Sequence, residues 1–242
     1  MVRIGLTGPT SNPAEKQTDP HPNPNMKVTR LAATATLALL FTTAMVVQAA
    51  EGWTVYQAKP RSKIRMEGTS NIHDWQVEGN IIGGTVEVGP NFPLDPTKAA
   101  PGKVDAKATV SIPVRSMKSV EKDGKPYNAK MDDIMYEKLL EPANKAIKFV
   151  LSELVVKEAD KTASDPVVFE AKGDLTVAGK SKTITMPVKI TVMPENQLKF
   201  SGSVALKMTD FGIQPPEPLG LGIKTGDDVK LIFDWVTGKK AQ

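Results

Sequence analysis

The chain has 242 residues, with 31 Lys and Arg against 27 Asp and Glu, and it contains no cysteine. A chain of this length forms one or two domains, and the absence of cysteine excludes disulfide scaffolds, thiolate metal sites and acylation of a lipoprotein cysteine. Because the charges nearly balance, the composition does not indicate a nucleic-acid partner.

Residues 1–25 have the composition of an unstructured extension. They are rich in Pro, Asn and Thr and carry no periodic apolar pattern. Such a segment cannot bury enough apolar surface to offset the entropy lost on ordering. We therefore expect residues 1–25 to be disordered or untranslated.

Residues 26–49 have the order of a secretory signal peptide. Lys27 and Arg30 precede an uncharged run, Leu31 to Val47, which ends in small residues. The run is nearly long enough to span a bilayer, so an uncleaved membrane anchor is the alternative. The threonines within the run and the small residues at its end favour removal. We predict cleavage after Ala49 and a periplasmic or secreted mature protein.

The remaining segment, 50–242, consists of runs in which apolar and polar residues alternate, as in half-buried β-strands. The first run is divided at Pro60, because proline cannot donate to a ladder. Glycines at 79, 83 and 84 interrupt the second run, as at a bulge or a sharp bend. The predicted strands are 53–58 with 62–68, 73–88, 103–115, 146–157, 166–177, 181–193, 197–209 and 227–238.

One helix is predicted, from Asn128 to Leu140. Four apolar residues in it recur at spacings of three and four and form a stripe, and Pro142 closes it. The stripe consists of Met131, Ile134, Met135 and Leu139. The neighbouring carboxylates Asp132 and Asp133 are expected to be solvated near the start of the helix.

About eight strands, one short helix and hairpin connections predict an all-β fold, either an antiparallel up-and-down barrel or a sandwich. An eight-stranded barrel either fills with side chains or holds a small ligand, so the size of the inward residues matters. Several inward positions are small, which leaves two possibilities: they leave volume for a cavity, or they pack closely against the helix. These positions are Ala106, Ala108, Ala171, Gly173 and Gly202.

No residue pattern predicts catalysis or a resident metal. Gly179-Lys180-Ser181 lacks the earlier glycine of a phosphate-binding loop, because position 174 is Asp, and a strand follows it rather than a helix. His73, beside Asp74, is the only histidine of segment 50–242, so a triad or a histidine metal site has no visible partners. No G-x-S-x-G elbow occurs. We expect neither an enzyme nor a cofactor.

Four segments, in this order, resemble the YceI-like domain family: GTSNIHDW (68–75), MDDIMYEKLLEPANKAIKF (131–149), GDLTVAGKSKTITMPVKI (173–190) and KMTDFGI (207–213). The resemblance covers nearly all of segment 50–242. It implies an exported bacterial protein with a lipocalin-like eight-stranded barrel and one short helix, whose apolar tunnel holds a polyisoprenoid such as a polyprenyl phosphate or an isoprenoid quinone. The opening strand differs from that of better-studied members, so the resemblance leaves the head group open.

The implied partner is an isoprenoid lipid, held for carriage or storage. Transient contact with a membrane surface and a homodimer are further candidate interactions. The alternative is an exported β-domain with a filled core that acts through its surface, since each inward residue is equally at home in an ordinary core. The residues predicted to line the tunnel are Trp75, Val110, Phe149, Phe169, Leu175, Ile190, Leu206 and Phe233.

Overall fold

The computed structural model describes residues 52–157, 166–217 and 222–241, which lie in one compact unit, Gln48–Gln242. The predicted extension 1–25 and signal peptide 26–49 fall outside the described residues. The strands are β1 (Thr54–Ala58), β2 (Lys63–Ser70), β3 (Trp75–Gly79), β4 (Gly83–Val88), β5 (Gly102–Lys103), β6 (Ala106–Pro113), β7 (Met117–Val120), β8 (Ala146–Val156), β9 (Val167–Val177), β10 (Lys180–Met193), β11 (Gln197–Lys207) and β12 (Thr225–Lys239), and the α-helix is α1 (Ala129–Lys138).

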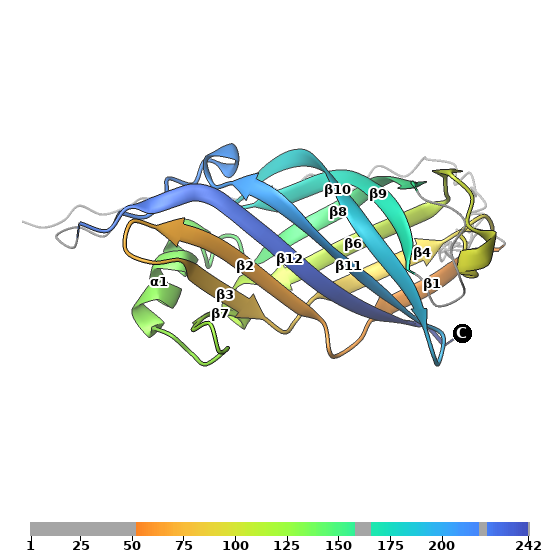
Figure 1. Ribbon diagram of the computed structural model, residues 1–242, viewed down its shortest axis with the longest axis horizontal. Helices are drawn as coiled ribbons and strands as arrows, with labels where there is room; N and C mark the ends of the chain where they lie inside the picture. The colour runs from red at the N-terminus through yellow and green to blue at the C-terminus, as the bar shows by residue number, and fades with distance from the viewer. Residues whose placement is uncertain (1–51, 158–165, 218–221, 242) are drawn as a thin grey trace, which may run out of the picture. The chain divides into compact units, whose positions relative to one another are not determined.

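Eight antiparallel strands close into a barrel in the order β1-β4-β6-β8-β9-β10-β11-β12, and β1 pairs back onto β12. The closing pairs include Tyr56 with Lys239 and Ala58 with Thr237. Neighbours in the barrel follow one another along the chain, as in an up-and-down topology. The predicted barrel is therefore confirmed, and the sandwich alternative is wrong. Figure 1 shows the long strands β8 to β12 crossing the barrel obliquely.

Three of the barrel strands are bent and continue at one end as a second set of pairs. The chain breaks at Pro60 and again between Gly79 and Gly83, as the sequence predicts, so that β1 continues as β2 and β4 continues from β3. The long strand β12 pairs with β2 through its first half and with β1 through its second half. At this end the sheet runs β12-β2-β3-β7 and stops at β7.

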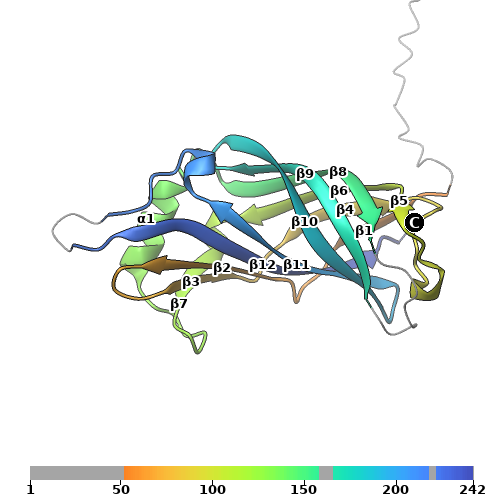
Figure 2. The same ribbon diagram turned by 45° about the horizontal axis from the view of Figure 1, so that its top comes forward.

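Helix α1 lies beside β7 at this end of the barrel (Figures 1 and 2). Buried Asp132 accepts a hydrogen bond from the Ser119 amide at 2.6 Å and forms an ion pair with Lys118 at 3.2 Å. The Tyr136 hydroxyl donates to the Met117 carbonyl at 2.8 Å. The expectation that Asp132 is solvated is therefore wrong: it is 7% exposed, because it anchors the helix to β7. Among the described residues, no helix is long and apolar enough to cross a membrane.

The opposite end of the barrel is covered by the segment that follows β4 and contains a single 3-10 turn, Pro96–Lys98 (Figure 2). Phe92 of this segment is buried and stacks on Phe169 of β9, with ring centroids 5.7 Å apart. Aromatic stacking of this kind adds to the area that the two rings bury. The two ends of the barrel thus differ, since one carries the helix and the other carries a stacked aromatic pair.

Candidate functional site

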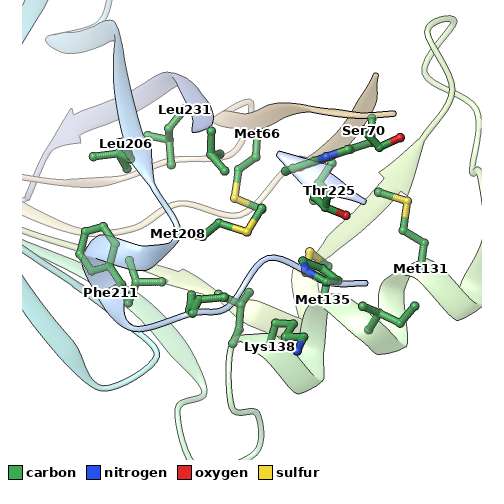
Figure 3. Close-up of a pocket in the computed structure, with 18 of the residues that line it drawn as sticks. Met66, Ser70, Met131, Met135, Lys138, Leu206, Met208, Phe211, Thr225 and Leu231 are labelled. Atoms are coloured by element: carbon green, nitrogen blue, oxygen red, sulfur yellow. The ribbon is translucent and has the colours of Figure 1, made fainter. Parts of the chain in front are cut away.

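The larger of two cavities lies between α1 and the inner faces of β2, β3, β11 and β12, with a volume of about 310 Å³. Most of the side chains that line it are apolar, and methionines come from three separate places in the chain. Met66 comes from β2, Met131 and Met135 from α1, and Met208 from the residue after β11 (Figure 3). The apolar stripe of α1, predicted from its spacing, faces this cavity.

A second cavity, of about 70 Å³, lies farther along the barrel interior. Ile147, Leu175 and Leu231 line both cavities, so the two share a wall. All side chains lining the smaller cavity belong to Ile, Val, Leu, Met, Phe or Trp. One of them, Trp235, carries an indole N–H that is buried without a hydrogen-bond partner among the described residues. The barrel interior beyond the helix is therefore apolar.

Six of the eight predicted lining residues border these cavities. Trp75 and Leu206 line the larger cavity, Leu175 lines both, and the others line the smaller cavity: Val110, Phe149 and Phe233.

Phe169 and Ile190 border neither cavity, although both are buried, at 1% and 3% exposure. Phe169 packs under Phe92, and the return of the segment after β4 onto β9 has no signal in the local sequence. The sequence prediction also omitted Met66, Met208 and the helix stripe as lining residues. The stripe could have been found, because its spacing already marked an inward face.

Aromatic rings lie over glycines on neighbouring strands, where a side chain would otherwise stand. A Cβ atom on Gly202 would lie 2.8 Å from the Phe233 ring, and one on Gly173 would lie 2.5 Å from the Phe149 ring. The Trp75 ring covers Gly68 in the same way. These glycines therefore accept rings against the barrel wall; they do not pack against the helix.

A polar pair stands at the edge of the larger cavity. His73 Nδ1 lies 2.8 Å from the Asp74 carbonyl, and His73 Nε2 lies 3.2 Å from the Tyr127 hydroxyl. Because a carbonyl can only accept, Nδ1 carries the proton, and the Tyr127 hydroxyl then donates to Nε2. Both residues line the cavity and are exposed. Nowhere in the described parts of the chain do three or more His, Cys, Asp or Glu side chains cluster closely enough to hold a metal ion.

Ion pairs fix the turn that follows β11. Lys207 contacts Asp228 at 2.8 Å, and this hydrogen bond raises the pKa of the Lys207 ammonium. The hydroxyl and the amide of Thr209 donate to the Asp227 carboxylate, at 2.7 and 2.9 Å, and lower the pKa of that carboxyl. These contacts tie the short turn Thr209–Phe211, whose Phe211 lines the larger cavity, to the start of β12.

Comparison with known proteins identifies the family. The fold is similar to that of BcnA from Burkholderia cenocepacia, with a TM-score of 0.53 and 20% identity, over 72% of this chain and 95% of that one. It is also similar to a polyisoprenoid binding domain from Saccharophagus degradans, with a TM-score of 0.53 and 10% identity, over 77% of this chain and 99% of that one. At these identities the likeness is one of fold. No curated protein matches the sequence. The YceI-like domain profile matches residues 53–237, and the chain therefore belongs to the YceI-like domain family.

Proposed function

We propose that this protein binds a lipid with a polyisoprenoid chain, of the polyprenyl phosphate or isoprenoid quinone type, and carries or stores it inside the barrel. The observation that supports the proposal is the cavity of about 310 Å³, whose walls are apolar and which adjoins a second apolar cavity. A similar barrel from Saccharophagus degradans is described as a polyisoprenoid binding domain. The proposal assigns no catalytic step to the protein.

The physical basis is the burial of hydrocarbon. Each CH₂ group removed from water contributes about 0.8 kcal/mol, so about ten such groups contribute about 8 kcal/mol before the costs of association are subtracted. The methionines at the cavity wall suit a methyl-branched chain, because their flexible thioethers adapt to irregular shapes. Loading such a ligand requires transient contact with a membrane surface, since a free polyisoprenoid is insoluble in water.

Extraction of the purified protein tests the proposal. The full chain is expressed in a bacterial host that makes polyprenyl lipids, and the purified protein is extracted with organic solvent for mass spectrometry. We expect a polyisoprenoid lipid from the wild type. Leu231 lines both cavities, so Leu231→Trp should fill the space and reduce the bound lipid.

The matched control is Val150→Trp, because Val150 is 51% exposed on β8 and lines neither cavity. Leu206→Phe serves as a second filling variant, and thermal melting shows which variants are folded. The proposal fails if the wild type yields no lipid, or if folded Leu231→Trp and Leu206→Phe carry as much lipid as Val150→Trp.

We propose further that the protein is exported through residues 26–49 and cut after Ala49, on the basis of the charged, apolar and small-residue order of that segment. The mature protein recovered from the periplasm or medium should then have the intact mass of residues 50–242. Leu39→Arg places a charge in the apolar run and should leave the precursor in the cytoplasm. Recovery of the uncut chain in the membrane fraction would support the anchor alternative instead.

A further inference from the structure

The charged side chains at the larger cavity share one sign. Among the described residues that line it, the fully charged ones are Lys130, Lys138 and Lys207, and none is Asp or Glu. The wall of a cavity for an uncharged ligand needs no such bias. The mouth therefore presents cationic groups and hydrogen-bond donors to whatever part of the ligand is polar.

The nearby carboxylates are occupied or lie away from the cavity lining. Lys207 is paired with Asp228 at 2.8 Å, and Asp132 is paired with Lys118 at 3.2 Å beneath the helix. The exposed carboxylates of Asp74, Asp133 and Glu137 do not line the cavity.

Lys130 and Lys138, in contrast, form no ion pair with any carboxylate of the described residues. Two cationic groups at the cavity edge are thus without a protein counter-charge in that part of the chain.

The two lysines flank the apolar stripe of α1. They stand eight residues apart on the helix, which at 1.5 Å per residue separates their backbones by about 12 Å. Ile134 lies between them on the same face, and the next row holds Met131 and Met135. Figure 3 shows Lys138 on α1 together with these methionines at the cavity. A lysine can lay its stem along such an apolar surface and keep its ammonium group at the water boundary.

We propose that the ligand carries an anionic head group, which the ammonium groups of Lys130 and Lys138 hold at the mouth while the chain enters the barrel. This inference depends on the proposed function and narrows it, because it selects an anionic lipid over a neutral quinone. The chemistry is that of a phosphate ester, and a carboxylate amphiphile shares its charge. A hydrogen bond between charged partners is worth more than a neutral one, so the two lysines distinguish the two classes of head group.

The test compares ligands that differ only in the head. Geranylgeranyl phosphate and geranylgeraniol share one chain, and palmitate and inorganic phosphate complete the series. Dissociation constants are measured by displacement of a fluorescent lipid from the mature protein. The double variant Lys130→Gln/Lys138→Gln should weaken geranylgeranyl phosphate about tenfold or more, as expected for charge-assisted contacts. Its affinity for geranylgeraniol should change by less than about twofold, the size of a weak surface effect.

The matched control is Lys148→Gln/Lys189→Gln, which removes the same charge from exposed strand positions that line neither cavity. Lys130→Arg/Lys138→Arg should restore the binding of the phosphate. High salt should weaken the phosphate and not the alcohol, because exposed charges are screened.

Each other outcome is decisive. If the wild type binds phosphate and alcohol equally, or if both double variants lose the same affinity, the inference is wrong although the proposed function stands. If neither prenyl ligand binds, both fail together. Palmitate binding with the same dependence on the lysines extends the site to carboxylates. Displacement by inorganic phosphate alone would show a free-anion site and would contradict a lipid head-group site.

Discussion

At the scale of single residues, glycines determine where the aromatic rings of the barrel can lie. Gly202 is the direct cross-strand partner of Phe233, and Gly68 is that of Trp75. A ring that covers a cross-strand glycine lies against the sheet, and such pairs also help to fix strand register. The aromatic side chains can therefore line the bore without filling it.

Substitution of Gly202 tests this role. A Cβ atom there would lie 2.8 Å from the Phe233 ring and 2.6 Å from the Pro187 carbonyl. Gly202→Ala should therefore push the ring inward and cost about 1–3 kcal/mol of unfolding free energy, as overpacking does. Urea denaturation measures the loss, and the amount of extractable lipid should fall with it.

Gly83→Ala is the matched control, because a Cβ at Gly83 meets only the Ser111 carbonyl, at 3.4 Å. Phe233→Leu should recover part of the stability when it is combined with Gly202→Ala, as contacting residues are not additive. Equal stability of Gly202→Ala and Gly83→Ala would show that the ring has room to move elsewhere.

At the scale of elements, the sequence predicts what local chemistry decides. The predicted strand ends agree with the structure to within three residues, because alternation and breakers such as Pro60 act over short distances. Helix α1 is confirmed for the same reason. The four residues of β7 were missed as a separate strand, and with them the amide of Ser119 that makes Asp132 a buried anchor.

The candidate site divides along the same line. Alternation identifies the inward face of each strand, and six of the eight predicted residues border the cavities for that reason. It does not tell how far along the barrel an inward residue stands. Phe169 and Ile190 are inward, yet Phe169 lies under Phe92 from a segment more than seventy residues earlier in the chain. The choice between barrel and sandwich also depended on a distant contact, the pairing of β1 with β12.

At the scale of the whole barrel, the cavities set a capacity for the ligand. The larger one has a volume of about 310 Å³. A water-sized atom needs about 10–15 Å³ of such space, so this cavity holds on the order of 20–30 non-hydrogen atoms, or roughly four to six isoprene units. The stacked rings of Phe92 and Phe169 cover the far end, so a longer chain has to leave by the mouth beside α1.

Chain length should therefore limit affinity. For prenyl alcohols of about 15, 20, 30 and 55 carbons, the gain of about 0.8 kcal/mol per buried CH₂ should continue only until the cavity is full. We expect affinity to rise to about 20–30 carbons, in line with the capacity of the cavity, and then to level off. Displacement of a fluorescent lipid measures each alcohol, and Leu231→Trp should move the plateau to a shorter chain because Leu231 borders both cavities. An affinity that keeps rising to the longest alcohol would mean that the barrel opens at its far end, past the Phe92–Phe169 stack, and that the mouth beside α1 is not the only way in.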